Sequence, residues 1–146
     1  KLYQTLPKTL VNDTAITAEY ARFLIRNQDY DQAEYHLRRC LRKELDNRLI
    51  ELYSLLPCEE NQLLFAESLL KKNPHSAALY LCLGRMCLSR HLWGKAKHYL
   101  EQSIELNPTP VAFIELGKLH EKLNDPLSSG SCYKKGLELI TKDELS

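Results

Sequence analysis

Apolar residues recur along this chain with the period of an α-helix, most clearly between Ala77 and Pro108. In the first half of this stretch, four residues at i, i+3, i+4 and i+7 share one helical face: Tyr80, Leu83, Gly84 and Cys87. The second half repeats the spacing with Ala96, Tyr99, Leu100 and Ser103. The pattern predicts two helices joined by a short turn. Gly84 and Ala96 are small, so we expect the two helices to approach closely there.

This helix pair ends at Asn107-Pro108, because proline cannot continue a helix and its predecessor avoids the α conformation. Pro74 and Pro108 are 34 positions apart. An aromatic residue, a Leu-Gly pair, an alanine and a closing proline at a period of about 34 residues form the tetratricopeptide signature. The sequence therefore predicts an all-α tetratricopeptide fold, a right-handed superhelix of antiparallel helix pairs.

The same periodicity predicts about four repeats in a single domain. They cover residues 14–43, 46–72, 77–106 and 110–141, and residues 1–12 are interpreted as the remnant of a preceding element. Within the first two repeats we expect helices at 14–26, 30–43, 46–56 and 59–72. Ala33 and Ala96 are 63 positions apart, which is about five fewer than two repeat periods. We expect these residues to be missing from the turn inside the second repeat, and the superhelix to bend there.

Helix ends are marked by residues that cap free backbone N–H groups. Asp29-x-x-Gln32 predicts a capping box, Ser76 an N-cap, and both Thr109-Pro110 and Asp125-Pro126 a cap followed by proline at the first helical position. On the last helix the pattern points four residues inward: Ser129, Tyr133, Gly136 and Leu137. This helix should fade by Thr141, and no amphipathic capping helix follows. An array without such a cap exposes an apolar flank, so we expect either self-association through this flank or a missing segment.

Composition narrows the classes of partner. The chain has 146 residues with 20 basic and 19 acidic side chains, so its net charge of +1 predicts no bulk attraction to nucleic acid or membrane. No apolar run approaches the ~20 residues of a membrane span. The sequence starts with Lys1 instead of methionine, which favours a fragment of a longer protein. The five cysteines form no Cys-x-x-Cys pair and are interpreted as packed, reduced thiols.

Residues for catalysis or metal binding are not apparent. The five histidines are scattered without His-x-x-x-His spacing, and Cys82 and Cys87 are not placed on one helical face. No glycine-rich phosphate loop or nucleophile elbow occurs. The sequence predicts no catalytic residue, no metal site and no cofactor, so the chain is not expected to be an enzyme.

A binding surface is the stronger hypothesis, because the first helix of each repeat lines the concave face of such arrays. Helical spacing puts Glu51, Leu55 and Glu121 on that face, together with ten main candidates: Arg22, Ile25, Arg26, Arg48, Leu81, Arg85, Leu88, Ile114, Lys118 and Lys122. Helix surfaces are often charged, so one interpretation is an ordinary solvated face. The alternative is a groove for an acidic or carboxylate-ended peptide, held by arginine forks and aliphatic strips.

Particular strings also resemble the HemY family over about residues 6–139. They are Tyr20-Ala21-Arg22, Asp31-x-Ala33-Glu34, Leu56-Pro57, Ala66-Glu67-x-x-Leu70, Leu83-Gly84-Arg85, Leu92-Trp93-Gly94-Lys95-Ala96 and Asn107-Pro108-Thr109-Pro110. HemY proteins are bacterial inner-membrane proteins associated with the late steps of heme biosynthesis. They have an N-terminal membrane anchor and a tetratricopeptide region facing the cytoplasm. The resemblance implies a soluble fragment from the cytoplasmic side of the inner membrane and maps no catalytic residue onto this chain.

The function expected from these observations is a non-catalytic scaffold for partner proteins, with enzymes of late protoheme biosynthesis as the implied clients. One alternative is a generic adaptor for unrelated clients, such as envelope assembly factors. Another is a heme or porphyrin carrier with propionates on the groove arginines, for which only His120 or a cysteine offers an axial ligand.

Overall fold

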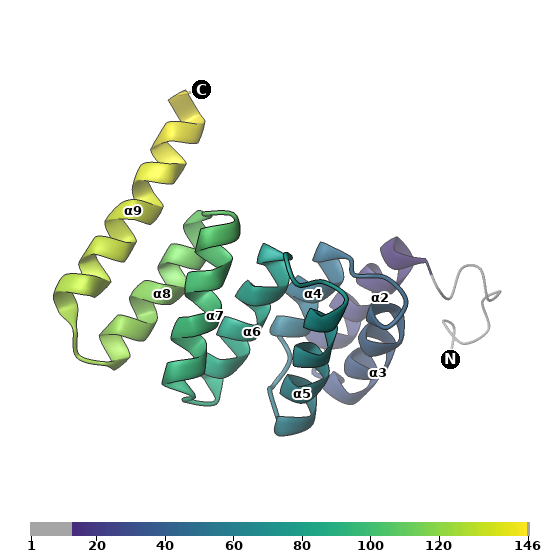
Figure 1. Ribbon diagram of the computed structural model, residues 1–146. Helices are drawn as coiled ribbons and strands as arrows, with labels where there is room; N and C mark the ends of the chain where they lie inside the picture. The colour runs from purple at the N-terminus through teal and green to yellow at the C-terminus, as the bar shows by residue number, and fades with distance from the viewer. Residues whose placement is uncertain (1–12, 146) are drawn as a thin grey trace. The chain divides into compact units, whose positions relative to one another are not determined.

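The computed structural model describes residues 13–145, and this part of the chain contains helices and no strand (Figure 1). The elements are α2 (Thr14–Arg26), α3 (Tyr30–Leu41), α4 (Asn47–Ser54), α5 (Glu60–Ser68), the 3₁₀ turn η2 (Leu69–Lys71), α6 (Ala77–Ser89), α7 (Trp93–Leu106), α8 (Pro110–Lys122) and α9 (Pro126–Leu145). Backbone contacts divide the chain between Pro57 and Cys58 into two compact units. The prediction that all repeats form a single domain stays a prediction.

The first unit consists of the pair α2 and α3 with α4 packed against both. Its core is formed by small, branched and aromatic residues on facing helices: Thr17, Ala21, Leu24, Ala33, Leu37, Leu49, Ile50 and Tyr53. Ala21 and Ala33 are fully buried, so their short side chains let α2 and α3 approach closely. A polar cluster closes the side of this core, where Glu34 Oε2 accepts hydrogen bonds from the Tyr53 hydroxyl and from Arg38 Nε, each at 2.6 Å.

The second unit contains two long antiparallel pairs, α6 with α7 and α8 with α9, with α7 packed on α8 and α5 on α6. Gly84 of α6 faces Leu100 of α7, and a Cβ added to this glycine would come within 2.5 Å of Leu100 Cδ2. The predicted close approach is therefore real, but its contact is Leu100, one turn beyond the expected Ala96. Gly117 of α8 likewise lies under the ring of Tyr133 on α9.

Three of the turns inside helix pairs share one backbone conformation. Gln28, His91 and Asn124 have φ values of 59°, 60° and 58°, in the left-handed region. They join α2 to α3, α6 to α7 and α8 to α9, and each of these turns has three residues between the helices. The repeated left-handed residue is the common device that reverses the chain in these pairs.

The shortened second repeat is explained differently from the sequence prediction. Its turn, residues 55–59, is longer than the others, whereas α4 has 8 residues and α5 has 9. The helix pairs elsewhere in the described chain are built from helices of 12 to 20 residues. The missing residues are thus lost from the helices, and the expectation of a shortened turn was wrong. The predicted helix 59–72 also ends early, at Ser68, and continues only as η2.

Most of the helix caps that the sequence predicts are present in the structure. Asp13, Ser76, Thr109 and Asp125 each accept a backbone hydrogen bond at the start of a helix. The capping box predicted at Asp29 is wrong, because Asp29 makes no side-chain cap hydrogen bond. A capping box does form at Glu59 and Gln62, at the start of α5.

The last helix differs from the prediction at its outer end. Ser129, Cys132 and Gly136 are buried, but Leu137 is 64% exposed, so its predicted inward position was wrong. Gly136 contacts Pro110, the first residue of α8. The residues of α9 after Gly136 therefore continue past the N-terminal end of α8. The helix α9 runs to Leu145 instead of fading at Thr141.

Candidate functional site

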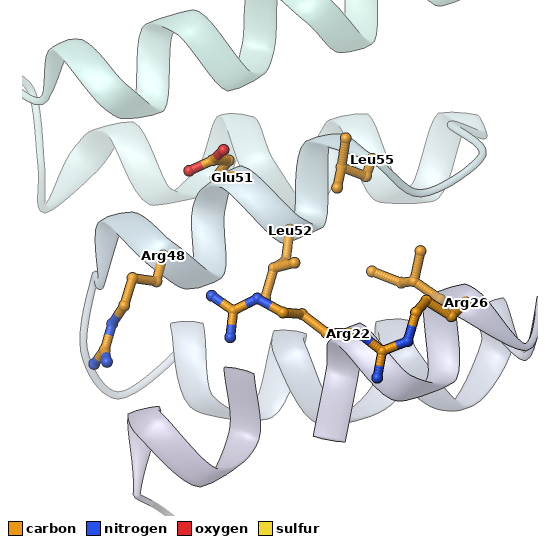
Figure 2. A pocket seen from close by; sticks show the side chains of 7 residues that line it. Arg22, Arg26, Arg48, Glu51, Leu52 and Leu55 are labelled. Atoms are coloured by element: carbon orange, nitrogen blue, oxygen red, sulfur yellow. The ribbon is translucent and has the colours of Figure 1, made fainter. Parts of the chain in front are cut away.

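A hollow of about 340 Å³ lies in the first unit between α2 and α4 (Figure 2). It is lined by Arg22, Ile25, Arg26, Arg48, Glu51, Leu52 and Leu55. Six of these residues are ones that helical spacing placed on the concave face, and Leu52 is the addition. The structure thus brings together the predicted binding residues of the first two repeats.

Helical periodicity explains how the chain builds this hollow. Arg22, Ile25 and Arg26 lie at i, i+3 and i+4 on α2, beside the stripe that is buried against α3. On the α4 side the lining residues follow at i, i+3, i+4 and i+7: Arg48, Glu51, Leu52 and Leu55. Two neighbouring helices therefore each contribute one face to the same concave surface.

Three of the residues that line the hollow are apolar. Leu52 is only 6% exposed and belongs to the core, whereas Leu55 is 57% exposed. Ile25 is half-buried on the α2 side. An exposed aliphatic side chain beside a concave surface offers a partner apolar area to bury.

The three arginines have different surroundings. Arg48 binds Asp46 through two of its nitrogens, at 3.2 and 3.0 Å, and also donates to Thr14 Oγ1 at 2.9 Å. The hydrogen bond from Arg48 lowers the pKa of the Asp46 carboxyl, which also caps α4. Arg22 pairs with Glu19 at 2.5 Å along α2. Arg26 makes no ion pair within the described residues.

The other six main candidates belong to the second unit, as does Glu121 of α8. Leu81, Arg85 and Leu88 are on α6, and Ile114, Lys118 and Lys122 are on α8. Arg85 Nε and Lys118 Nζ approach the same oxygen, Glu115 Oε1, at 3.8 and 3.3 Å. Sequence reasoning missed Glu115, although its position three residues before Lys118 is the usual spacing of a helical ion pair. Two of the predicted basic side chains are therefore partly neutralised by a carboxylate of the chain itself.

The thiols are placed for packing. All five cysteines are free, four of them are buried and Cys58 is half-buried. Burial raises the pKa of Cys82 to about 12 and that of Cys87 to about 11, so both stay protonated near neutral pH. Among the described residues there is no group of three or more His, Cys, Asp or Glu side chains that could hold a metal ion. Searched over the same residues, no helix has the length and apolar character needed to cross a membrane.

No protein-family model and no curated protein sequence matches the chain. Solved structures do match it. The structure titled "MamA RS-1 ArsTM double mutant" aligns with a TM-score of 0.65 and 16% identity over 92% of this chain and 79% of that one. MamA residues 41 to the end from Desulfovibrio magneticus RS-1 align with a TM-score of 0.63 and 18% identity over 90% and 77%. MamA is a tetratricopeptide repeat protein. The helical pairs seen here thus have the tetratricopeptide fold that the repeat pattern predicts.

Proposed function

We propose that this protein is a non-catalytic scaffold that binds segments of partner proteins on the first helices of its repeats. The observation that carries the proposal is the hollow between α2 and α4, where arginines lie beside an exposed leucine. In repeat proteins of this kind each helix pair contacts only its neighbours, and the concave surfaces are used for binding. A surface with both charged and aliphatic groups is suited to an extended peptide.

The proposed clients are enzymes of late protoheme biosynthesis at the cytoplasmic side of the bacterial inner membrane. This part rests on the resemblance to the HemY family, which is strongest at residues 92–96. In the structure Leu92 precedes α7, Trp93 is its first residue, and the Trp93 ring stacks on His91 at 5.0 Å between centroids. The membrane would be reached through an N-terminal anchor of the whole protein, as in that family. A groove that continues along all four first helices stays a prediction.

Binding of purified enzymes tests the proposal. We would mix the chain with each purified bacterial enzyme of the last steps of protoheme synthesis and measure binding by calorimetry. Enzymes of similar size and charge from an unrelated pathway serve as controls. We expect at least one late-pathway enzyme to bind and the controls not to bind.

Two results would contradict parts of this proposal. Equal binding of pathway enzymes and controls would contradict the assignment of heme-pathway enzymes as clients and would favour a generic adaptor. A heme absorbance shift on titration with the chain alone, abolished by His120→Ala, would favour the carrier function instead.

A further inference from the structure

The charges around the hollow indicate which kind of segment it binds. We propose that the hollow takes an acidic segment of a partner protein, in which a carboxylate is followed by an aliphatic side chain. The carboxylate binds Arg22 and Arg26 on α2, and the aliphatic side chain packs on the leucines of α4. This inference rests on the proposed function and specifies the ligand chemistry of the same site.

The carboxylate half of the site is formed by two arginines one helical turn apart. Arg22 and Arg26 lie at i and i+4, so their guanidinium groups extend from the same face of α2 (Figure 2). Arginine binds carboxylates through paired, charge-assisted hydrogen bonds. Arg26 has no carboxylate partner within the described chain. Glu19, the partner of Arg22, has 77% of its side chain exposed, and such surface pairs contribute little. A ligand carboxylate can therefore replace Glu19 at small cost.

Arg48 has a different role in the same hollow. Its guanidinium group is held by Asp46 and Thr14, and in Figure 2 it points away from the head groups of Arg22 and Arg26. Since Asp46 also caps α4, these bonds fix the start of α4. We assign Arg48 to positioning α4 and not to binding the ligand.

The aliphatic half of the site lies on the α4 side of the hollow, across from Arg22 and Arg26. Leu55 is largely exposed at the rim, and Leu52 closes the floor below it. Ile25 of α2, which is half-buried, also lines the hollow. An aliphatic side chain next to the bound carboxylate would bury Leu55, which is exposed in the chain alone.

Glu51 sets the direction of the ligand. It is exposed on α4, on the other side of the hollow from Arg22 and Arg26 (Figure 2). A carboxylate near α4 is repelled by Glu51, whereas one near α2 meets two positive charges. The acidic residue must therefore lie on the α2 side and the aliphatic residue on the α4 side. It also follows that removing the charge of Glu51 should strengthen the binding of an acidic peptide.

Short peptides measure this chemistry directly. The probe is a fluorescein-labelled Gly-Ser peptide with an amidated C-terminus that carries one Glu-Leu pair. Matched probes carry Gln-Leu with an amidated end, Glu-Ser with an amidated end, and Gln-Leu with a free C-terminal carboxylate. The last probe tells a chain-end carboxylate from a side-chain carboxylate as the group bound. Fluorescence anisotropy at low salt gives the dissociation constants.

Three variants distinguish binding in the hollow from a general effect of the net charge of the protein. Arg26→Glu should weaken binding of the Glu-Leu probe about tenfold or more, because one charge-assisted pair is replaced by a repulsion. Glu51→Gln should strengthen it, a gain that misfolding cannot produce. Arg39→Glu makes the same change of charge on α3, at an exposed position outside the hollow, and should have little effect. Thermal unfolding confirms that each variant is folded.

The inference is overturned by any of three results. They are equal affinity for the amidated Glu-Leu and Gln-Leu probes, equal loss of affinity in Arg26→Glu and Arg39→Glu, and no binding of any carboxylate probe. If late-pathway enzymes still bind the chain in any of these cases, the scaffold function stands and only this ligand assignment fails. If the peptides bind as expected but the enzymes do not, the ligand assignment stands and the proposed clients fail.

Discussion

Gly84 on α6 lies directly against Leu100 on α7, with room for a hydrogen atom and none for a methyl group. Leu100 is fully buried, so a shift of its side chain would have to be accommodated by the surrounding core. This one contact sets the distance between the two helices of the third repeat.

Substitution of Gly84 should therefore destabilise the protein. We expect Gly84→Ala to lower the free energy of unfolding by ~1–3 kcal/mol through overpacking. Gly130 on α9 is the matched control, because a Cβ there meets nothing within 4 Å. Gly130→Ala should raise stability by about 0.5–1 kcal/mol, the usual gain from removing a helical glycine. Urea unfolding measures both, and an unchanged midpoint for Gly84→Ala would show that α7 can move away freely.

The hydroxyl of Tyr53 should contribute measurably to the first unit. Burial and the hydrogen bond to Glu34 both raise the pKa of Tyr53, so the hydroxyl stays protonated and keeps donating. Tyr53→Phe should cost about 1–2 kcal/mol in thermal or urea unfolding, since the partly buried carboxylate of Glu34 loses the hydrogen bond from the Tyr53 hydroxyl. Tyr35→Phe is the control, because Tyr35 is exposed. Equal effects of the two variants would argue against a stabilising hydrogen bond at Tyr53.

Thiol labelling should separate Cys58 from the other cysteines. In the native protein, Cys58 should react first with a thiol reagent because it is the one half-buried cysteine, while the other four are buried. Burial raises the pKa of Cys58 too, so even its reaction should be slow at neutral pH. In denaturant without reductant, all five thiols should react. Recovery of three or fewer would reveal disulfides, and Cys58→Ser should remove the first native reaction.

Stability should fall at alkaline pH. Burial raises the pKa of Cys82 to about 12 and of Cys87 to about 11, above the value of 9.0 for an unperturbed thiol. Above pH 9 the unfolded chain releases these protons and the folded chain retains them, so the unfolded state gains. The contribution is complete below pH 9 and is lost as the pH rises through 11 to 12. Urea unfolding at pH 7.5 and above pH 9 measures the loss. Cys82→Ala should lower stability at neutral pH and flatten the alkaline slope, whereas an unchanged slope would contradict the assignment.

Arg85 should contribute more to the stability of the fold than Arg26 does, because Arg85 pairs with Glu115. Removing Arg85 leaves the Glu115 carboxylate, which is 13% exposed, with its ion pair to Lys118. We expect Arg85→Gln to lower stability by up to about 1 kcal/mol. Arg26→Gln should stay within ±0.5 kcal/mol, as for other exposed residues. The pair Arg85→Gln and Glu115→Gln should be less than additive, and full additivity would show that the two side chains do not interact.

The sequence was sufficient wherever the helical period and the caps agree. The helix 14–26 has the predicted bounds, because Asp13 caps its start and Gln28 adopts the turn conformation after its end. Six of the seven residues that line the hollow were predicted for the same reason, since positions one turn apart on one helix share a face. The fold class follows from the 34-residue period.

Three features were not predictable from spacing alone. Asp29 has the residue type of a cap, but its backbone has ψ of 67° instead of the extended value, and its side chain does not reach the helix. The loss of residues in the second repeat shortens the spacing between repeats by the same amount whether it comes from the turn or from the helices. Leu137 fits the apolar stripe of α9, but it follows Gly136, which lies against Pro110 at the N-terminal end of α8. Its exposure therefore depends on the relative lengths of the two helices.

The three left-handed turns have a consequence for how such a chain can change in length. Gln28 and His91 are 63 positions apart, and His91 and Asn124 are 33 apart. A single extra residue in one of these three-residue turns would move the left-handed position and rotate the second helix out of its packed face. The chain is therefore free to gain or lose whole helix pairs, while its tight turns resist insertions of single residues. Residues 55–59 lack this conformation and form a longer connection, so a small insertion should be tolerated better there than in the three-residue turns.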